Sequence, residues 1–169
     1  GDTITLENNT FTAGTLSSSG SGLVKINSGT YSNTFNISGT GRTIDDTDNL
    51  YSLIMEDGTI NTTLNLSSTG ISNIKAGTIS VNNGYAINNT GAGIITLGIN
   101  DSSTAPKADT RPIISGATYG IYTNNPNALI NFYDGIVSGQ KAYNLTVNDI
   151  ETGYSLGRDY DSSSDREEK

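Results

Sequence analysis

The chain has 169 residues, a formal net charge of −8, and neither cysteine nor histidine. These absences exclude disulfides, thiolate metal sites and acid–base or metal chemistry that depends on histidine. The excess of acidic over basic residues disfavours nucleic acid and anionic membranes as partners. The sequence contains no apolar run of about 18 residues, so it predicts no membrane-spanning segment. A hydrophobic content of only 33 %, beside 20 glycines, favours a thin core repeated many times.

Short apolar segments alternate with small polar residues from Thr3 to about Ile150. Period-2 alternation marks the segments 3–6, 24–26, 64–66 and 78–81. This alternation predicts short strands that each bury one face. Helix formers are scarce, and no apolar stripe with helical spacing occurs, so we expect an all-β chain.

One phrase recurs along the chain: aliphatic residues, a turn residue, and then a β-branched or aromatic residue. Its turn positions are Asn9, Gly29, Gly58, Gly77, Gly116 and Gly135. The spacings are 20, 29, 19, 39 and 19 residues. We interpret 29 as one period with an insertion of about ten residues, and 39 as two periods with an intermediate copy at 96–98.

A period near 20 is too short for helical-hairpin repeats, and the leucine-rich frame is missing. The repeat therefore predicts a β-solenoid of about seven or eight coils, each of 19–20 residues. We expect this domain to cover residues 1–156, with a polar tail or linker at 157–169. Two segments that break the rhythm, 39–48 and 100–112, are predicted to be loops at the edge of the rod.

Asparagine recurs beside the predicted bends, at Asn33, Asn82, Asn83, Asn88, Asn89, Asn124 and Asn125. If these residues stack from coil to coil, their amides can form a hydrogen-bonded ladder along the axis. The alternative is that they only form turns, since asparagine tolerates positive φ. Sequence alone leaves both interpretations open.

Four segments of the second half, 77–87, 91–98, 118–122 and 131–136, share a Gly-Thr-Ile or Gly-Ile style. Together they resemble repeats of large surface-anchored proteins of Gram-positive and gut bacteria. Such regions are similar to the single-stranded right-handed parallel β-helix of the pectate-lyase-like superfamily. The resemblance covers residues 77–154 well, whereas the first half of the chain shares only the style of these repeats. It implies right-handed coils, an extracellular location on the bacterial cell surface, and proteins described mostly as adhesins.

Acidic residues are candidates for polysaccharide cleavage, because glycosidases need two carboxylates about 5–10 Å apart. Adjacent coils bring Asp46 or Asp48 near Asp57 if the chain bends suitably. Further acids are Asp45, Glu56, Asp149 and Glu151. The oxygen-rich run 45–48 is a candidate calcium loop, although its spacing matches no known loop pattern. The alternative is that these are turn acids, and we expect no catalytic residue, no metal and no cofactor.

Tyrosine is the conspicuous aromatic residue, with nine copies, six of them in the last third of the chain. The candidate ligand-binding residues are Tyr119, Tyr122, Tyr133 and Tyr143. Exposed tyrosine rings stack on sugar rings, while buried ones fill the coil interior, and either role suits an amphipathic aromatic side chain.

We expect a non-enzymatic bacterial cell-surface module, an adhesin or rigid stalk, within a larger secreted or anchored protein. Its expected partner is a host or cell-wall glycan, or a surface protein. The alternative is a carbohydrate-binding or polysaccharide-cleaving β-helix. Facing carboxylates in a groove beside exposed tyrosine favour the alternative, and a flat surface of serine, threonine and asparagine favours the stalk.

Overall fold

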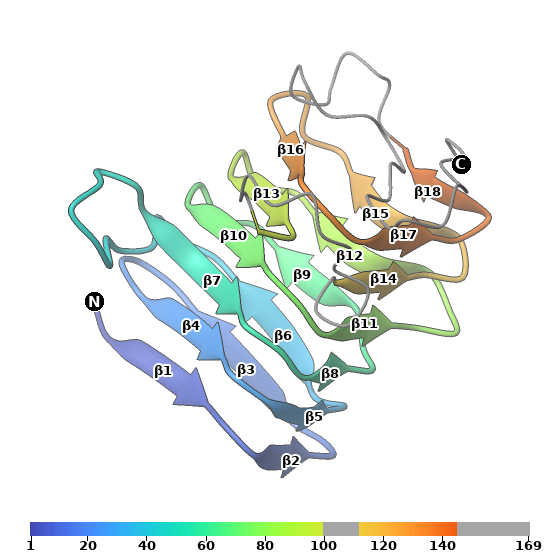
Figure 1. Cartoon of the computed structure of the whole chain (residues 1–169), viewed down its shortest axis with the longest axis horizontal. Coiled ribbons are helices and arrows are strands. Elements are labelled where there is room, and N and C mark those ends of the chain that lie inside the picture. The colour runs from blue at the N-terminus through green and yellow to red at the C-terminus, as the bar shows by residue number, and fades with distance from the viewer. Residues whose placement is uncertain (100–111, 145–169) are drawn as a thin grey trace.

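The computed structural model describes residues 1–99 and 112–144, and the strands of this part form three parallel sheets of six strands each (Figure 1). Consecutive strands enter the three sheets in turn, so the chain visits each sheet once per coil. The described residues therefore make six coils. The described part contains no helix long and apolar enough to span a membrane.

We call the three sheets A, B and C. Sheet A contains β1 (Thr3–Leu6), β4 (Leu23–Ile26), β7 (Tyr51–Met55), β10 (Ile71–Ile74), β13 (Ile94–Leu97) and β16 (Leu129–Phe132). Sheet B contains β2 (Asn9–Phe11), β5 (Gly29–Tyr31), β8 (Thr59–Ile60), β11 (Thr78–Ser80), β14 (Ile113–Ser115) and β17 (Ile136–Ser138). Sheet C contains β3 (Thr15–Ser18), β6 (Thr34–Ile37), β9 (Leu64–Leu66), β12 (Tyr85–Asn89), β15 (Tyr119–Thr123) and β18 (Lys141–Tyr143).

The all-β class and the parallel solenoid-like stacking are confirmed, but the interval of 39 residues was interpreted wrongly. It holds one coil boundary instead of two, because β11 pairs directly with β14, with Thr78 opposite Ile113. The segment 96–98, expected to be an intermediate copy, belongs to β13 and its end in sheet A. The additional length is the connection between β13 and β14, of which residues 100–111 lie outside the described part.

The interval of 29 residues is one coil with an insertion, as predicted. Val24 of β4 pairs directly with Leu53 of β7, and the insertion follows β6. An antiparallel bridge between Arg42 and Tyr51 closes the inserted loop. The Arg42 guanidinium also donates to Thr3 Oγ1 at 3.2 Å, which attaches the loop to the first strand.

Glycine recurs at the corner between sheets A and B in three successive coils. Three predicted turn glycines follow one another there with φ of 114°, 110° and 89°: Gly29, Gly58 and Gly77. A Cβ on Gly77 would lie 2.5 Å from the Gly58 carbonyl oxygen, so a side chain does not fit. In the next coil Pro112 takes this position, because Ile113 N donates to Gly77 O. Gly116 is therefore not equivalent to these glycines, contrary to the predicted repeat, because it follows β14 at the next corner.

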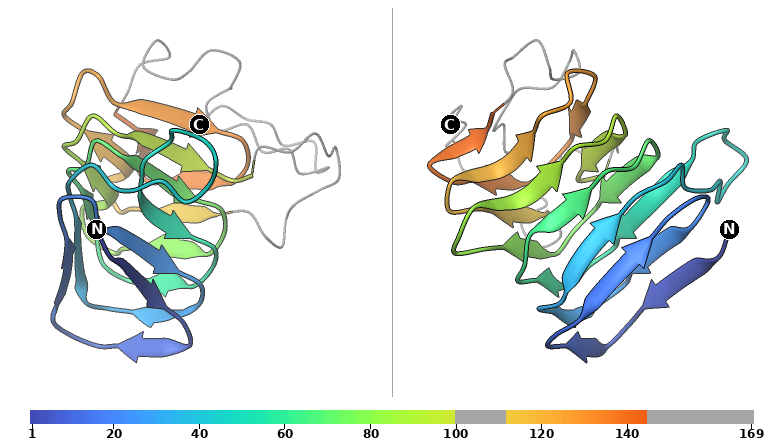
Figure 2. Two further views of the ribbon diagram at one scale, coloured as in Figure 1. Left: turned by 90° about the vertical axis from the view of Figure 1, so that its left-hand side faces the viewer. Right: turned by 180° about the vertical axis from the view of Figure 1, so that it is seen from behind.

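The core runs along the inside of the coils, from the N-terminal coil shown in blue to the orange coil at the other end (Figure 2). The core repeats from coil to coil, as one column of inward-facing side chains in sheet A shows. These residues are Leu6, Ile26, Met55, Ile74, Leu97 and Phe132. Each of these side chains packs on the same column one coil away. The first coil is covered on one side only, and Ile4 and Phe11 remain 44 % and 41 % exposed.

Candidate functional site

Two of the predicted ligand-binding tyrosines lie together on sheet C. Tyr119 and Tyr122 of β15 meet Tyr85 of β12, a residue the sequence reasoning missed. The rings of Tyr85 and Tyr122 stack, with centroids 4.4 Å apart and planes 11° apart. Tyr119 is tilted against both, at 5.8 Å from Tyr85 and 5.6 Å from Tyr122. We call these three half-buried residues the tyrosine cluster.

The register of β12 and β15 builds this cluster. Tyr85 pairs with Tyr119, and Ile87 pairs with Ile121, so equivalent residues of the two coils superpose. The isoleucines point into the core and are fully buried. A sequence signal for Tyr85 existed, because Tyr85-Ala86-Ile87 and Tyr119-Gly120-Ile121 are the same phrase one coil apart.

Tyr143 belongs to the core and not to an exposed platform, contrary to its place among the candidates. It pairs with Ile121 at the end of the inward column of sheet C and is 7 % exposed. Its hydroxyl has no hydrogen-bond partner among the described residues. Burial raises the pKa of this phenol, because the charged form is poorly solvated inside the coil. Of the two roles open to these tyrosines, filling the interior applies here.

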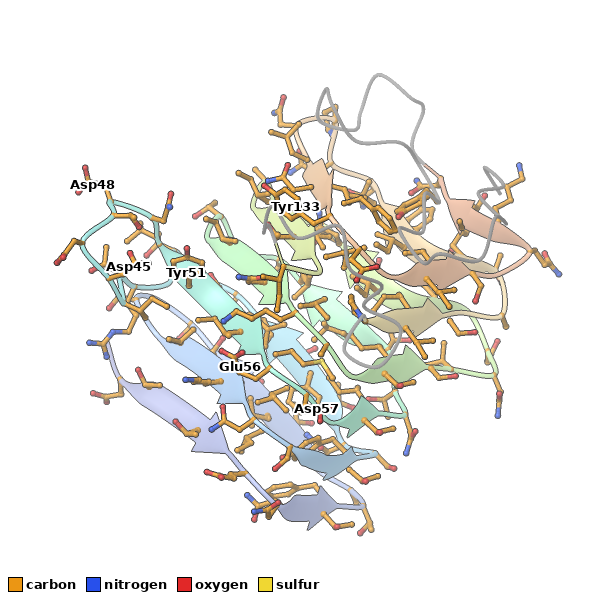
Figure 3. The ribbon with its side chains drawn as sticks, in the orientation of Figure 1. Asp45, Asp48, Tyr51, Glu56, Asp57 and Tyr133 are labelled. Atoms are coloured by element: carbon orange, nitrogen blue, oxygen red, sulfur yellow. The ribbon has the colours of Figure 1, made fainter. Side chains whose placement is uncertain are left out.

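Tyr133 lies apart from the tyrosine cluster, directly after β16 of sheet A. It lines a pocket of about 400 Å³ on the outer face of that sheet, which we call the sheet A pocket. Tyr51 of β7 is a second aromatic residue of its lining. Figure 3 labels both tyrosines, which come from strands at the two sides of β10 and β13.

A polar row forms the middle of the sheet A pocket. Asn73 of β10 pairs with Thr96 of β13, which in turn pairs with Asn131 of β16. Neighbouring strands are about 4.8 Å apart, so the two asparagines are separated by roughly 10 Å along the axis. The Oδ1 atoms of Asn73 and Asn131 are buried and have no hydrogen-bond partner. Sequence reasoning missed this row, because only the pairing register reveals it.

A single ion pair flanks this pocket in the described structure. Lys75 Nζ lies 2.8 Å from Glu56 Oε1, with side chains 32 % and 36 % exposed. The residues belong to adjacent coils, immediately after β10 and β7. Glu56 therefore compensates the charge that Lys75 brings to the pocket lining.

Asparagine takes both of the roles left open by the sequence. Asn65 Nδ2 donates to Asn36 Oδ1 at 3.2 Å, and Asn88 Nδ2 donates to Asn65 Oδ1 at 3.3 Å. We call these three residues of sheet C the asparagine ladder; of them only Asn88 was among the predicted positions. Asn125 forms a turn instead, since its Oδ1 accepts a hydrogen bond from Asn127 N at 2.9 Å.

The expected approach of Asp46 or Asp48 to Asp57 does not occur. The loop that carries Asp48 precedes β7, whereas Asp57 follows it, and Figure 3 shows Asp48 and Asp57 at opposite ends of this strand. A strand of that length spans about 17 Å, well beyond the separation that glycosidic chemistry uses. The other candidate acids, Asp149 and Glu151, lie outside the described residues.

Two acids of these segments, Asp45 and Asp57, hold turns. Asp57 Oδ1 accepts from Gly58 N at 2.7 Å, and Asp45 Oδ1 accepts from Thr47 N at 3.0 Å. Within residues 1–99 and 112–144, no group of three or more acidic side chains is arranged to hold a metal ion. The interpretation as turn acids therefore has a structural basis for Asp45 and Asp57.

The described residues form an all-β protein of stacked parallel coils. The outer face of sheet A carries the sheet A pocket, and sheet C carries the tyrosine cluster and the asparagine ladder. Comparisons with protein-family models, curated proteins and solved structures find no match for this chain. Its function must therefore be argued from its own residues.

Proposed function

We propose that this chain is a non-enzymatic module of the bacterial cell surface, a stiff adhesin segment that presents a glycan-binding face. The observation that carries the proposal is the tyrosine cluster. Three half-buried tyrosines from two coils are packed against one another on one sheet. A host or cell-wall glycan is the proposed partner.

Stiffness follows from the stacking of the coils. Each sheet continues through six strands, and the strands pair in parallel register from coil to coil. Backbone groups between the first and last strands are therefore paired along the axis, which opposes local unfolding and proteolysis. Such a rod is suited to hold a binding surface away from a cell wall.

The tyrosine cluster is suited to sugar rings for two reasons. Its aromatic faces provide apolar area with little loss of side-chain entropy, because the rings already restrict one another. Its phenol groups supply donors and acceptors at the rim. Tyr122 also pairs with Asn88, so the cluster continues directly into the asparagine ladder.

Cleavage of the glycan is not part of the proposal. Among the described residues, the candidate carboxylates of Asp48 and Asp57 lie at opposite ends of β7, and general acid–base cleavage needs two carboxylates across one bond. We also infer right-handed winding of the kind found in pectate-lyase-like β-helices. The support is general, because crossovers between parallel strands of one sheet are right-handed in nearly all proteins.

A glycan array probed with the wild-type chain tests the adhesive role. We expect binding to at least one glycan, and a loss of at least tenfold in signal for Tyr119→Ala and Tyr122→Ala. Phe11→Ala is the control, because it removes an exposed aromatic ring on β2, outside the cluster. Absence of binding across the array, or equal losses in all three variants, would contradict a glycan role for the cluster.

A further inference from the structure

We propose that the sheet A pocket binds a neutral, extended oligosaccharide that lies along the solenoid axis across β10, β13 and β16. This assignment rests on the adhesive role proposed above and gives it a second contact surface. Four features of the pocket support it: unpaired amide oxygens, an apolar row, aromatic residues in the lining, and a compensated charge.

The two unpaired amide oxygens are closed to solvent, so a ligand in the pocket reaches them only when rotation of each amide exchanges its oxygen and its nitrogen. Asn73 Oδ1 and Asn131 Oδ1 lack partners, although both residues line the pocket. A buried polar atom without a partner is unfavourable, and a bound donor removes that penalty. Each amide has a donor end and an acceptor end, and sugar hydroxyls both donate and accept, so they suit either orientation of the side chain.

An apolar row runs beside the polar one. Ile71 and Ile94 precede Asn73 and Thr96 by two residues, and all four side chains are half-buried on the outer face of the sheet. The pocket therefore offers a strip of aliphatic surface parallel to a strip of amide and hydroxyl groups. A pyranose ring has the same division, because its C–H face is apolar and its edge carries hydroxyls.

The spacing of the polar row favours a chain of sugars over a single ring. Asn73 and Asn131 belong to strands separated by β13, so they lie roughly 10 Å apart. Two β-linked hexose units in an extended chain cover a comparable length. Tyr51 and Tyr133 belong to the same lining and supply aromatic faces next to this row.

The charge of the pocket favours a neutral glycan. Lys75 is the cation of the lining, and it is already bonded to Glu56 at 2.8 Å. A polyuronate would have to displace Glu56 from this ion pair and would also meet a chain of net charge −8. Neutral hydroxyl groups meet neither obstacle.

Titration of the isotopically labelled chain, followed by NMR, tests the assignment. The probes are cellotetraose, xylotetraose and mannotetraose as neutral chains, and tetragalacturonate as the charged chain. We expect at least one neutral probe to shift the side-chain amide signals of Asn73 and Asn131. Asn73→Ala and Asn131→Ala should each weaken its binding at least tenfold, and Asn9→Ala, on an exposed position of β2 outside both surfaces, should change the Kd less than twofold.

Thr96→Val serves as the second variant, because it removes one hydroxyl from the same row while keeping the shape of the side chain. We expect a loss of binding of about threefold or more. Tighter binding of tetragalacturonate than of the neutral probes would overturn the assignment, as would shifts confined to the tyrosine cluster. The latter result would leave the proposed function intact, whereas shifts confined to the pocket would support the pocket and contradict the role of the cluster.

Discussion

The outer faces of sheets A and C carry asparagine rows that look alike in sequence and differ in bonding. In the asparagine ladder of sheet C, each side chain bonds to the next, at 3.2 and 3.3 Å. In the sheet A pocket, the amide oxygens of Asn73 and Asn131 have no partner. The same residue type therefore satisfies its hydrogen bonds on one face and leaves buried amide oxygens unpaired on the other.

Register explains this difference. On sheet C, Asn36 pairs with Asn65 and Asn65 pairs with Asn88, so an amide donor meets an amide acceptor in every step. On sheet A, Thr96 separates the two asparagines, and its shorter side chain interrupts the ladder. An amide row needs identical residues in consecutive coils to satisfy itself.

The largest effect on stability should come from the core. Buried side chains pack in an equivalent way beneath sheet A and beneath sheet C. Phe35 under sheet C and Phe132 under sheet A are 0 % and 1 % exposed. Replacing either by alanine should lower the free energy of unfolding by about 3–5 kcal/mol, through lost burial and a residual cavity. Chemical denaturation checks this, with exposed Phe11→Ala as the control. Losses that differ by more than about 2 kcal/mol between the faces would contradict their equivalence.

The next prediction concerns the two asparagine rows themselves. Asn65→Ala removes the centre of the ladder and two side-chain bonds to Asn36 and Asn88, so it should lower the free energy of unfolding by roughly 1–2 kcal/mol. Asn73→Ala should change it by less than about 0.5 kcal/mol, because its oxygen has no partner to lose. The measurement is the denaturation midpoint of each variant. Equal losses would show that the two rows do not differ in bonding.

A pH effect follows from the buried phenol behind sheet C. Burial raises the pKa of Tyr143, so the folded state keeps its proton after the unfolded state loses it near pH 10. The stability linked to this residue is complete below about pH 10 and decreases as the pH rises further, by about 1.4 kcal/mol per pH unit.

Tyr143→Phe should remove this part of the alkaline decrease. At pH 7 the substitution should be almost neutral, because the hydroxyl has no partner among the described residues. Denaturation at pH 7 and pH 11 measures both quantities, and Tyr133→Phe provides the control. A variant that loses as much stability as the wild type between these two pH values would contradict the assignment of the effect to Tyr143.

The last prediction concerns the ion pair beside the sheet A pocket, where the change in stability should be small. Glu56→Gln should lower the free energy of unfolding by less than about 1 kcal/mol, because the pair is about one-third exposed. It should nevertheless raise the affinity for tetragalacturonate, since Lys75 then has no carboxylate partner at 2.8 Å. Calorimetric titration measures this, with Asp57→Asn as the control. An unchanged preference for neutral chains would show that this charge does not select the ligand.

Much of the fold followed from local pattern. Alternation in segments such as 24–26 and 64–66 identified strands that are present as β4 and β9. The glycines at positions 29, 58 and 77 marked one corner, because the positive φ at these positions disfavours residues with a Cβ. The long interval before Gly116 was misinterpreted, since a period cannot show whether additional residues form a coil or a connection.

Composition and periodicity by themselves determined that this protein stacks short parallel strands around a thin core. Alternating burial and corner glycines each depend on residues only a few positions apart, so both can be recognised in the sequence. Only the tertiary structure decided which tyrosines meet, which one is buried, and which asparagines are left unbonded. These outcomes depend on the register between residues about 20 to 35 positions apart, and a shift of one residue would move each side chain to the other face.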